Sequence, residues 1–117
     1  MRSNGSLQDG ADKRSSPRSP ATRKVYIVVD GRSSKCSLID IAEGGARISV
    51  NGIATTAEEM IMVDGGASRV HLSRVIWRSD REAGLQFFKS DTFVGPTGGA
   101  QGALLIATGF AERLAGR

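Results

Sequence analysis

The sequence has few cysteine, histidine and aromatic residues, and each shortage excludes a class of protein. The 117 residues include one cysteine, Cys36, and one histidine, His71. A single cysteine excludes an intrachain disulfide, and these two residues together cannot supply the four ligands of a structural zinc site. We therefore expect a cytoplasmic protein that holds no metal and needs no cofactor.

Long apolar segments are also missing. No apolar run approaches the roughly 20 residues that a transmembrane helix requires, and the N-terminus lacks the apolar stretch of a secretory signal. We expect neither a membrane span nor export.

Positive charge is concentrated at the N-terminus. The formal net charge is +4, and residues 1–24 contain six basic and two acidic residues, which account for all of it. Residues 25–117 contain ten residues of each sign and are neutral overall. An anionic partner would therefore meet the N-terminal part of the chain. A nucleic acid polymer is not the expected partner, because only 5% of the residues are aromatic and the neutral remainder offers no basic groove.

The first two parts of the chain are predicted to be an arm and a strand-rich body. Residues 1–22 are rich in Ser, Arg, Gly and Pro with almost no large apolar side chain, which predicts a flexible arm. Residues 23–90 contain β-prone segments separated by turn signals such as Asp30-Gly31 and Asn51-Gly52. The six segments are residues 25–29, 36–41, 46–50, 58–63, 68–78 and 84–88. This pattern predicts an antiparallel barrel or sandwich, since closure would remove exposed strand edges.

Residues 91–117 are predicted to be a linker followed by a helix. The stretch VGPTGGAQG at residues 94–102 has the composition of a linker. Apolar residues then recur near helical spacing, at Leu104, Leu105, Ala107, Ala111 and Leu114. Gly109 weakens this helix, which is expected to cap the barrel.

Several further residues are interpreted as structural. Trp77 lies in an alternating segment and is expected in the core. His71 is expected at the surface or half-buried, because no nucleophile pattern accompanies it, and nothing in the sequence indicates an enzyme. Arg47, Trp77 and Arg78 are candidates to line one barrel face, and the sequence leaves the direction of each side chain open.

A pair of arginines in the arm has chemistry suited to a guanine nucleotide. The stretch KRSSPR at residues 13–18 places Arg14 and Arg18 four residues apart. An arginine fork binds phosphate through two hydrogen bonds and also fits the O6/N7 edge of guanine. By itself, this spacing is also a common accident in a basic tail.

A carboxylate followed by glycines forms the second motif. In IDIAEGGARI at residues 39–48, the Asp40 carboxylate complements the N1–H and amino group of guanine. Gly44 and Gly45 lack a Cβ, so the turn can adopt a positive φ and let a ligand approach its amides. By itself, this motif is also ordinary hairpin chemistry.

Together with RVIWRSDREAGLQF at residues 74–87, these motifs resemble the PilZ domain, a bacterial receptor for cyclic di-GMP. The resemblance covers about residues 13–90, and it implies a six-stranded antiparallel β-barrel with a C-terminal helix. It also implies that Arg14 and Arg18 grip phosphate and guanine, and that Asp40 and Gly45 are the ends of the second motif.

Two positions refine what the resemblance implies. Ala42 stands where the family usually has serine, and a missing hydroxyl removes a hydrogen bond worth about 0.5–1.5 kcal/mol, or up to roughly tenfold in affinity. Lys13 precedes the first arginine, where a basic residue allows family members to bind an intercalated dimer of the nucleotide.

The resemblance therefore implies a cyclic di-GMP receptor that orders its arm over the barrel and signals to a downstream protein partner. An alternative is a degenerate adaptor of the same fold that no longer binds nucleotide, with Ala42 as the mark of decay. A small nucleic-acid-binding barrel is a third hypothesis, for which the low aromatic content and the neutral body provide little support.

Overall fold

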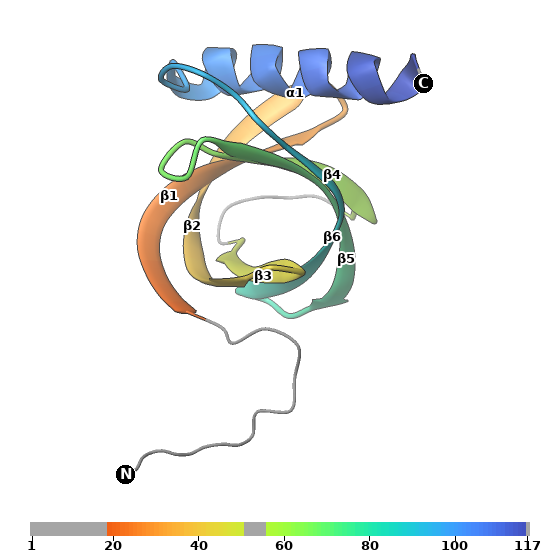
Figure 1. The fold of residues 1–117 in the computed structure, drawn as a ribbon. Coiled ribbons are helices and arrows are strands. Elements are labelled where there is room, and N and C mark those ends of the chain that lie inside the picture. The colour runs from red at the N-terminus through yellow and green to blue at the C-terminus, as the bar shows by residue number, and fades with distance from the viewer. Residues whose placement is uncertain (1–18, 51–55, 117) are drawn as a thin grey trace, which may run out of the picture.

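A closed barrel of six strands and one helix make up the described part of the chain. The computed structural model describes residues 19–50 and 56–116. Its elements are β1 (Ser19–Val29), β2 (Arg32–Ala42), β3 (Gly45–Ser49), β4 (Glu59–Asp64), β5 (Arg69–Arg78), β6 (Glu82–Thr92) and α1 (Gly99–Ala115). The strands close in the order β1-β2-β3-β6-β5-β4 with antiparallel pairing throughout (Figure 1). The predicted six-stranded antiparallel barrel with a C-terminal helix is confirmed.

Strand bounds differ from the sequence-based ranges mainly at the ends. β1 begins at Ser19 and β6 ends at Thr92, so the barrel strands extend past both ends of residues 23–90. The turn at Asp30-Gly31 has φ values of 51° and 76°, which is the geometry that a two-residue hairpin between twisted strands needs. The predicted turn at Asn51-Gly52 lies outside the described residues.

The barrel interior is filled by apolar side chains that alternate along the strands. They are Val25, Ile27, Cys36, Leu38, Ala46, Ile48, Met60, Met62, Ala83 and Leu85. Burial raises the pKa of the Cys36 thiol to about 12, so this cysteine stays protonated.

His71 also lies in the interior, and the prediction of a surface or half-buried position was wrong. Its side chain is only 4% exposed, its ring stacks on Phe87 at a centroid distance of 3.9 Å, and its Nδ1 atom is 2.7 Å from the Ser90 hydroxyl. The adjacent residues Val70 and Leu72 pack beneath α1 on the opposite face. This half of β5 is therefore covered on both faces, by the barrel interior and by α1. The local sequence around His71 does not show this, because both coverings come from distant segments.

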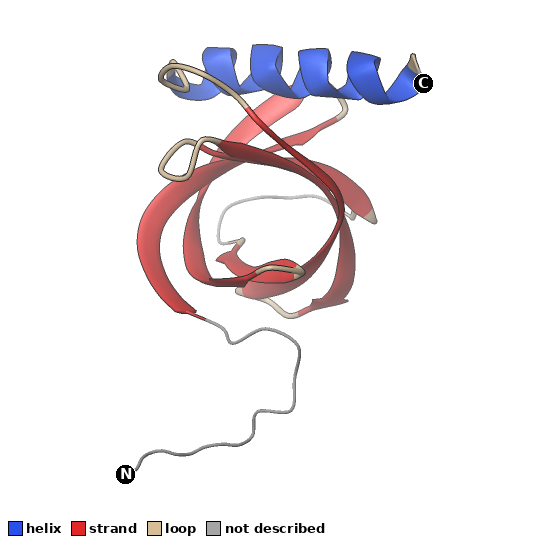
Figure 2. Cartoon of the chain, in the orientation of Figure 1, coloured by secondary structure: helices blue, strands red, loops and turns tan. Residues whose placement is uncertain are grey.

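A second apolar cluster joins α1 to the outside of the barrel. Ala103, Ala107 and Phe110 pack on Val28 and Val63, and the helix lies across one side of the barrel (Figures 1 and 2). The described residues contain no helix with the length and apolar character needed to cross a membrane.

The helix begins at Gly99, inside the segment 94–102 that was predicted to be a linker. Gly98 adopts a left-handed conformation with φ 80°, and a Cβ on Gly102 would collide with the Thr97 carbonyl. These glycines therefore serve a tight entry into the helix. The helix continues through Gly109 because its apolar face is anchored on the barrel.

The first half of β1 is fastened by an ion pair between a half-exposed arginine and a buried aspartate. Arg23 donates from Nε to Asp64 Oδ1 at 2.9 Å and from Nη2 to Oδ2 at 2.6 Å, and Asp64 is completely buried. The hydrogen bond to Asp64 raises the pKa of the Arg23 guanidinium. The strand that continues from the arm is thereby held to the end of β4.

Candidate functional site

One residue from each of five neighbouring strands forms a row across the outer face of the barrel. Pro20 is opposite Asp40, Asp40 is opposite Arg47, Arg47 is opposite Gly84, and Gly84 is opposite Trp77. Residues directly opposite each other in paired strands point to the same face. The residues on either side of Arg47 and of Gly84 fill the interior, so this row, which we call the outer row, faces outward.

The centre of the outer row is an ion pair. Arg47 donates from Nη2 to Asp40 Oδ2 at 2.8 Å and from Nε to the same oxygen at 3.0 Å. Its Nη1 atom is 3.4 Å from Glu82 Oε1. The Asp40 side chain is 14% exposed and that of Arg47 is 42% exposed. The arginine therefore orients the carboxylate while leaving part of its own guanidinium open to solvent.

Trp77 is at the far end of the row, and the expectation that it belongs to the core was wrong. Its side chain is 43% exposed, and the indole ring lies so close to Gly84 that a Cβ on that glycine would collide with it. The β5–β6 register shifts between Val75 and Trp77. This bulge explains the change of face, because one extra residue moves every following side chain to the other side.

The β2–β3 hairpin brings the rest of the glycine motif beside Asp40. Ala42 ends β2 opposite Gly45, the first residue of β3, and the Gly44 carbonyl accepts a hydrogen bond from the Phe87 amide at 2.9 Å. Neither Gly44 nor Gly45 has a positive φ, so the conformational reason expected for these glycines does not apply. Gly45 is instead required by packing, because a Cβ there would collide with the Leu85 carbonyl.

Lys13, Arg14 and Arg18 lie outside the described residues. The structure does describe the strand that follows them, in which Ser19 is opposite Ile41 and Pro20 is opposite Asp40. The chain therefore enters the barrel beside the second motif, with Arg18 bonded directly to the residue that pairs with Ile41.

Of the residues considered for one barrel face, Arg47 and Trp77 do share the outer row. Arg78 donates to the Ala57 carbonyl at 2.7 Å, away from that row. Sequence reasoning did not identify Gly84 as a member of the outer row or Glu82 as a partner of Arg47. Both residues lie in the stretch RVIWRSDREAGLQF, but their places beside Arg47 depend on the pairing of β6 with β3.

Comparison with known proteins agrees with this geometry. The chain matches the PilZ domain family over residues 12–92, and a search of curated proteins found no match. PilZ domains are receptor and adaptor modules for cyclic di-GMP and are not enzymes. The match spans more than half of the chain and includes both motifs and all six strands, and we conclude that the protein belongs to the PilZ domain family.

Proposed function

We propose that this protein binds cyclic di-GMP between its arginine arm and the outer row, and that the bound arm forms a surface for a downstream protein partner. The observation that carries the proposal is the pairing of Ser19 with Ile41 and of Pro20 with Asp40. The arm thus continues from a strand residue beside the carboxylate that suits guanine.

The arm supplies the cations. Arg18 precedes Ser19 directly, and Arg14 is near enough to reach a ligand on the outer row, because five extended residues span up to about 17 Å. Guanidinium forks suit both the phosphates and the O6/N7 edge of guanine. Lys13 adds a third cation, which suits the larger charge of an intercalated nucleotide dimer.

The barrel supplies the complementary groups. Asp40 is held on the outer face by Arg47 at 2.8 Å and offers a carboxylate to the N1–H and amino group of guanine. Trp77 is 43% exposed in the same row, and its flat indole offers a stacking surface for a purine. Asp40 and Trp77 are three strands apart, so they offer an edge contact and a face contact to different parts of one cyclic di-GMP molecule.

The hairpin shapes the approach to Asp40. A Cβ on Gly44 would meet nothing within 4 Å, so this part of the turn leaves room for a ligand. Gly45 keeps β3 close to β6 and thereby sets the position of the turn. Ala42 contributes no hydrogen bond, and we expect weaker binding rather than none, since a neutral hydrogen bond is worth about 0.5–1.5 kcal/mol.

Isothermal titration with cyclic di-GMP tests the proposal. The wild-type protein should show saturable binding, and Arg18→Ala should weaken it by roughly tenfold to a hundredfold, because a charge-assisted hydrogen bond contributes about 1.5–3 kcal/mol. Arg32→Ala is the matched control, since Arg32 is an exposed arginine at the β1–β2 turn and its replacement changes the charge equally. GTP serves as the ligand control.

Two results would contradict the proposal. An equal loss of affinity in Arg18→Ala and Arg32→Ala would mean that only net charge matters. If the wild-type protein shows neither heat nor amide shifts up to millimolar ligand, the degenerate adaptor is the better description.

A further inference from the structure

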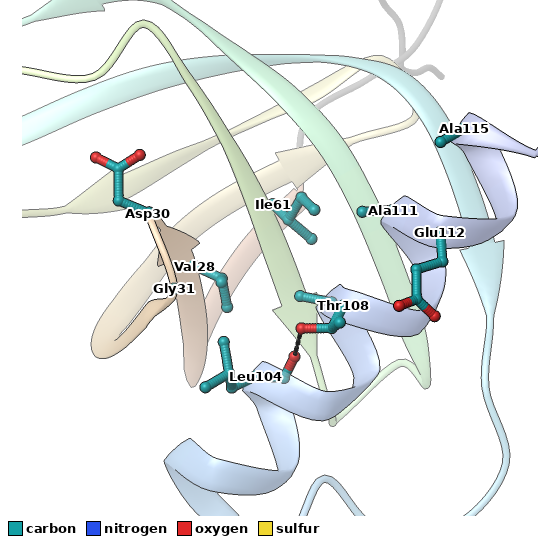
Figure 3. A pocket seen from close by; sticks show the side chains of 10 residues that line it. Val28, Asp30, Gly31, Ile61, Leu104, Thr108, Ala111, Glu112 and Ala115 are labelled. Atoms are coloured by element: carbon teal, nitrogen blue, oxygen red, sulfur yellow. Dashed lines mark hydrogen bonds between the residues drawn. The ribbon is translucent and has the colours of Figure 1, made fainter.

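A hollow on the side of the molecule that α1 covers shares no lining residue with the outer row. It lies between α1, the β1–β2 turn and β4 and has a volume of about 440 Å³ (Figure 3). We call it the α1 groove. Its lining residues are Val28, Asp30, Gly31, Ile61, Leu104, Ala107, Thr108, Ala111, Glu112 and Ala115.

The floor of the α1 groove is apolar. Val28 and Ala107 are buried, and Ile61 and Leu104 are half-buried. The Thr108 hydroxyl donates to the Leu104 carbonyl at 2.8 Å, so it is already engaged within the helix. The floor therefore offers contact surface to apolar side chains and few groups for hydrogen bonding.

The side of the α1 groove that is formed by the helix carries small side chains. Ala111 and Ala115 are exposed and small, and the wall from Leu104 to Ala115 runs along α1 for about 17 Å, at 1.5 Å per residue. Within this wall, small side chains recur over about two turns, from Ala107 to Ala115, and they allow another backbone to approach closely.

The two charged groups of the groove are both carboxylates. Asp30 comes from the β1–β2 turn and Glu112 from α1, and they flank the hollow in Figure 3. Among the described residues, no ion pair or side-chain hydrogen bond engages either carboxylate. Arg113, the neighbouring cation on the helix, is directed to Asp91 at 3.2 Å.

The position of Glu112 strengthens the negative potential. It lies in the last turn of α1, where the helix dipole already places partial negative charge and where a cation is favoured. An apolar floor between two carboxylates thus complements an apolar face flanked by basic residues.

We propose that the α1 groove binds a basic amphipathic helix of a partner protein. An extended peptide is disfavoured, because the barrel formed by the described strands is closed and presents no edge for strand addition. A helix satisfies its own backbone and presents apolar residues at i, i+3, i+4 and i+7 with flanking lysines or arginines. The groove lies outside the outer row, so helix and nucleotide can be bound at the same time.

The probe for this proposal is a labelled peptide of about 15 leucine and lysine residues at helical spacing. Fluorescence anisotropy should show saturable binding to the full-length protein, with amide shifts confined to residues 28–31, 61 and 104–115. Asp30→Asn with Glu112→Gln should weaken binding at least about tenfold, since both charge pairs are lost. Ala111→Trp, which fills the groove, should also prevent binding while circular dichroism shows an unchanged fold.

The controls separate this groove from general attraction between charges. Glu58→Gln with Asp80→Asn removes the same charge from exposed sites elsewhere and should change affinity by no more than about twofold. A scrambled peptide of the same composition should bind much more weakly. The proposal is wrong if the control variant loses as much affinity as Asp30→Asn with Glu112→Gln, or if the scrambled peptide binds as tightly as the helical one. It is also wrong if the amide shifts of the α1 groove appear without peptide as the protein concentration rises. That result would make a second copy of the chain the occupant.

Discussion

At the scale of single residues, Gly44 and Gly45 show that identical neighbours can be present for different reasons. A Cβ on Gly44 meets nothing within 4 Å, whereas a Cβ on Gly45 would collide with the Leu85 carbonyl. Both lie in the motif beside Asp40, yet only Gly45 is demanded by the fold. The distinction depends on the approach of β6, which is remote in sequence.

Alanine substitutions should separate these two roles. Gly45→Ala should lower the free energy of unfolding by about 2 kcal/mol or more, because the backbone of β6 must shift to make room. Gly44→Ala should change it by no more than about 0.5 kcal/mol. Urea denaturation of both variants measures the difference, and equal destabilisation would show that the close contact of Gly45 is not decisive.

At the scale of an element, β5 combines three environments in ten residues. Val70 faces α1, His71 faces the barrel interior, and Trp77 faces solvent after the bulge. Burial lowers the pKa of His71 from 6.5 to about 4, since the imidazolium form would have to be desolvated. The neutral ring is therefore part of the folded core.

This shifted pKa predicts a loss of stability in acid. Below pH 6.5 the unfolded chain takes up a proton that the folded chain accepts only near pH 4. The contribution of His71 is therefore complete above pH 6.5 and falls toward pH 4, by at most about 3 kcal/mol. Urea unfolding between pH 7 and pH 4 should show a steeper loss for the wild type than for His71→Gln.

The same histidine permits a direct check by NMR. It is the only histidine in the chain, so its ring signal needs no assignment by mutation. A titration midpoint near its ordinary pKa in the folded protein would contradict the predicted acid sensitivity.

At the scale of the whole molecule, the outer row and the α1 groove occupy different parts of one barrel. The row crosses β1, β2, β3, β6 and β5, and the groove follows α1 beside Val28 and Ile61. A barrel that carries both surfaces suits an adaptor, because a nucleotide and a protein segment need not compete for the same residues.

Thermal unfolding tests this separation. At a hundred times its Kd, cyclic di-GMP should raise the free energy of unfolding by about 2.7 kcal/mol, which corresponds to a Tm increase of roughly 10 °C for a domain of this size. The variant Asp30→Asn with Glu112→Gln should show the same increase. Arg18→Ala, with its tenfold to hundredfold weaker binding, should gain only about 0.4–1.4 kcal/mol at the same ligand concentration. Loss of the increase in the groove variant would mean that the two surfaces are not independent.

Features that depend on local pattern could be predicted from the amino-acid sequence alone. Alternating apolar residues and turn pairs such as Asp30-Gly31 were sufficient to predict six strands, and apolar spacing was sufficient to predict the helix. The arginine pair, the motif around Asp40 and the stretch at residues 74–87 were together sufficient to predict the family. These signals are local because strand, turn and helix propensities act over a few neighbouring residues.

The side that each residue faces, and the segment that covers it, depend instead on how the strands and the helix pack together. A bulge opposite Gly84 turns Trp77 to solvent, the covering of β5 on both sides buries His71, and the packing of α1 on the barrel creates the groove between Asp30 and Glu112. Each outcome depends on the register or packing of segments far apart in the chain. A one-residue shift in pairing reverses the faces of a strand without changing its sequence pattern.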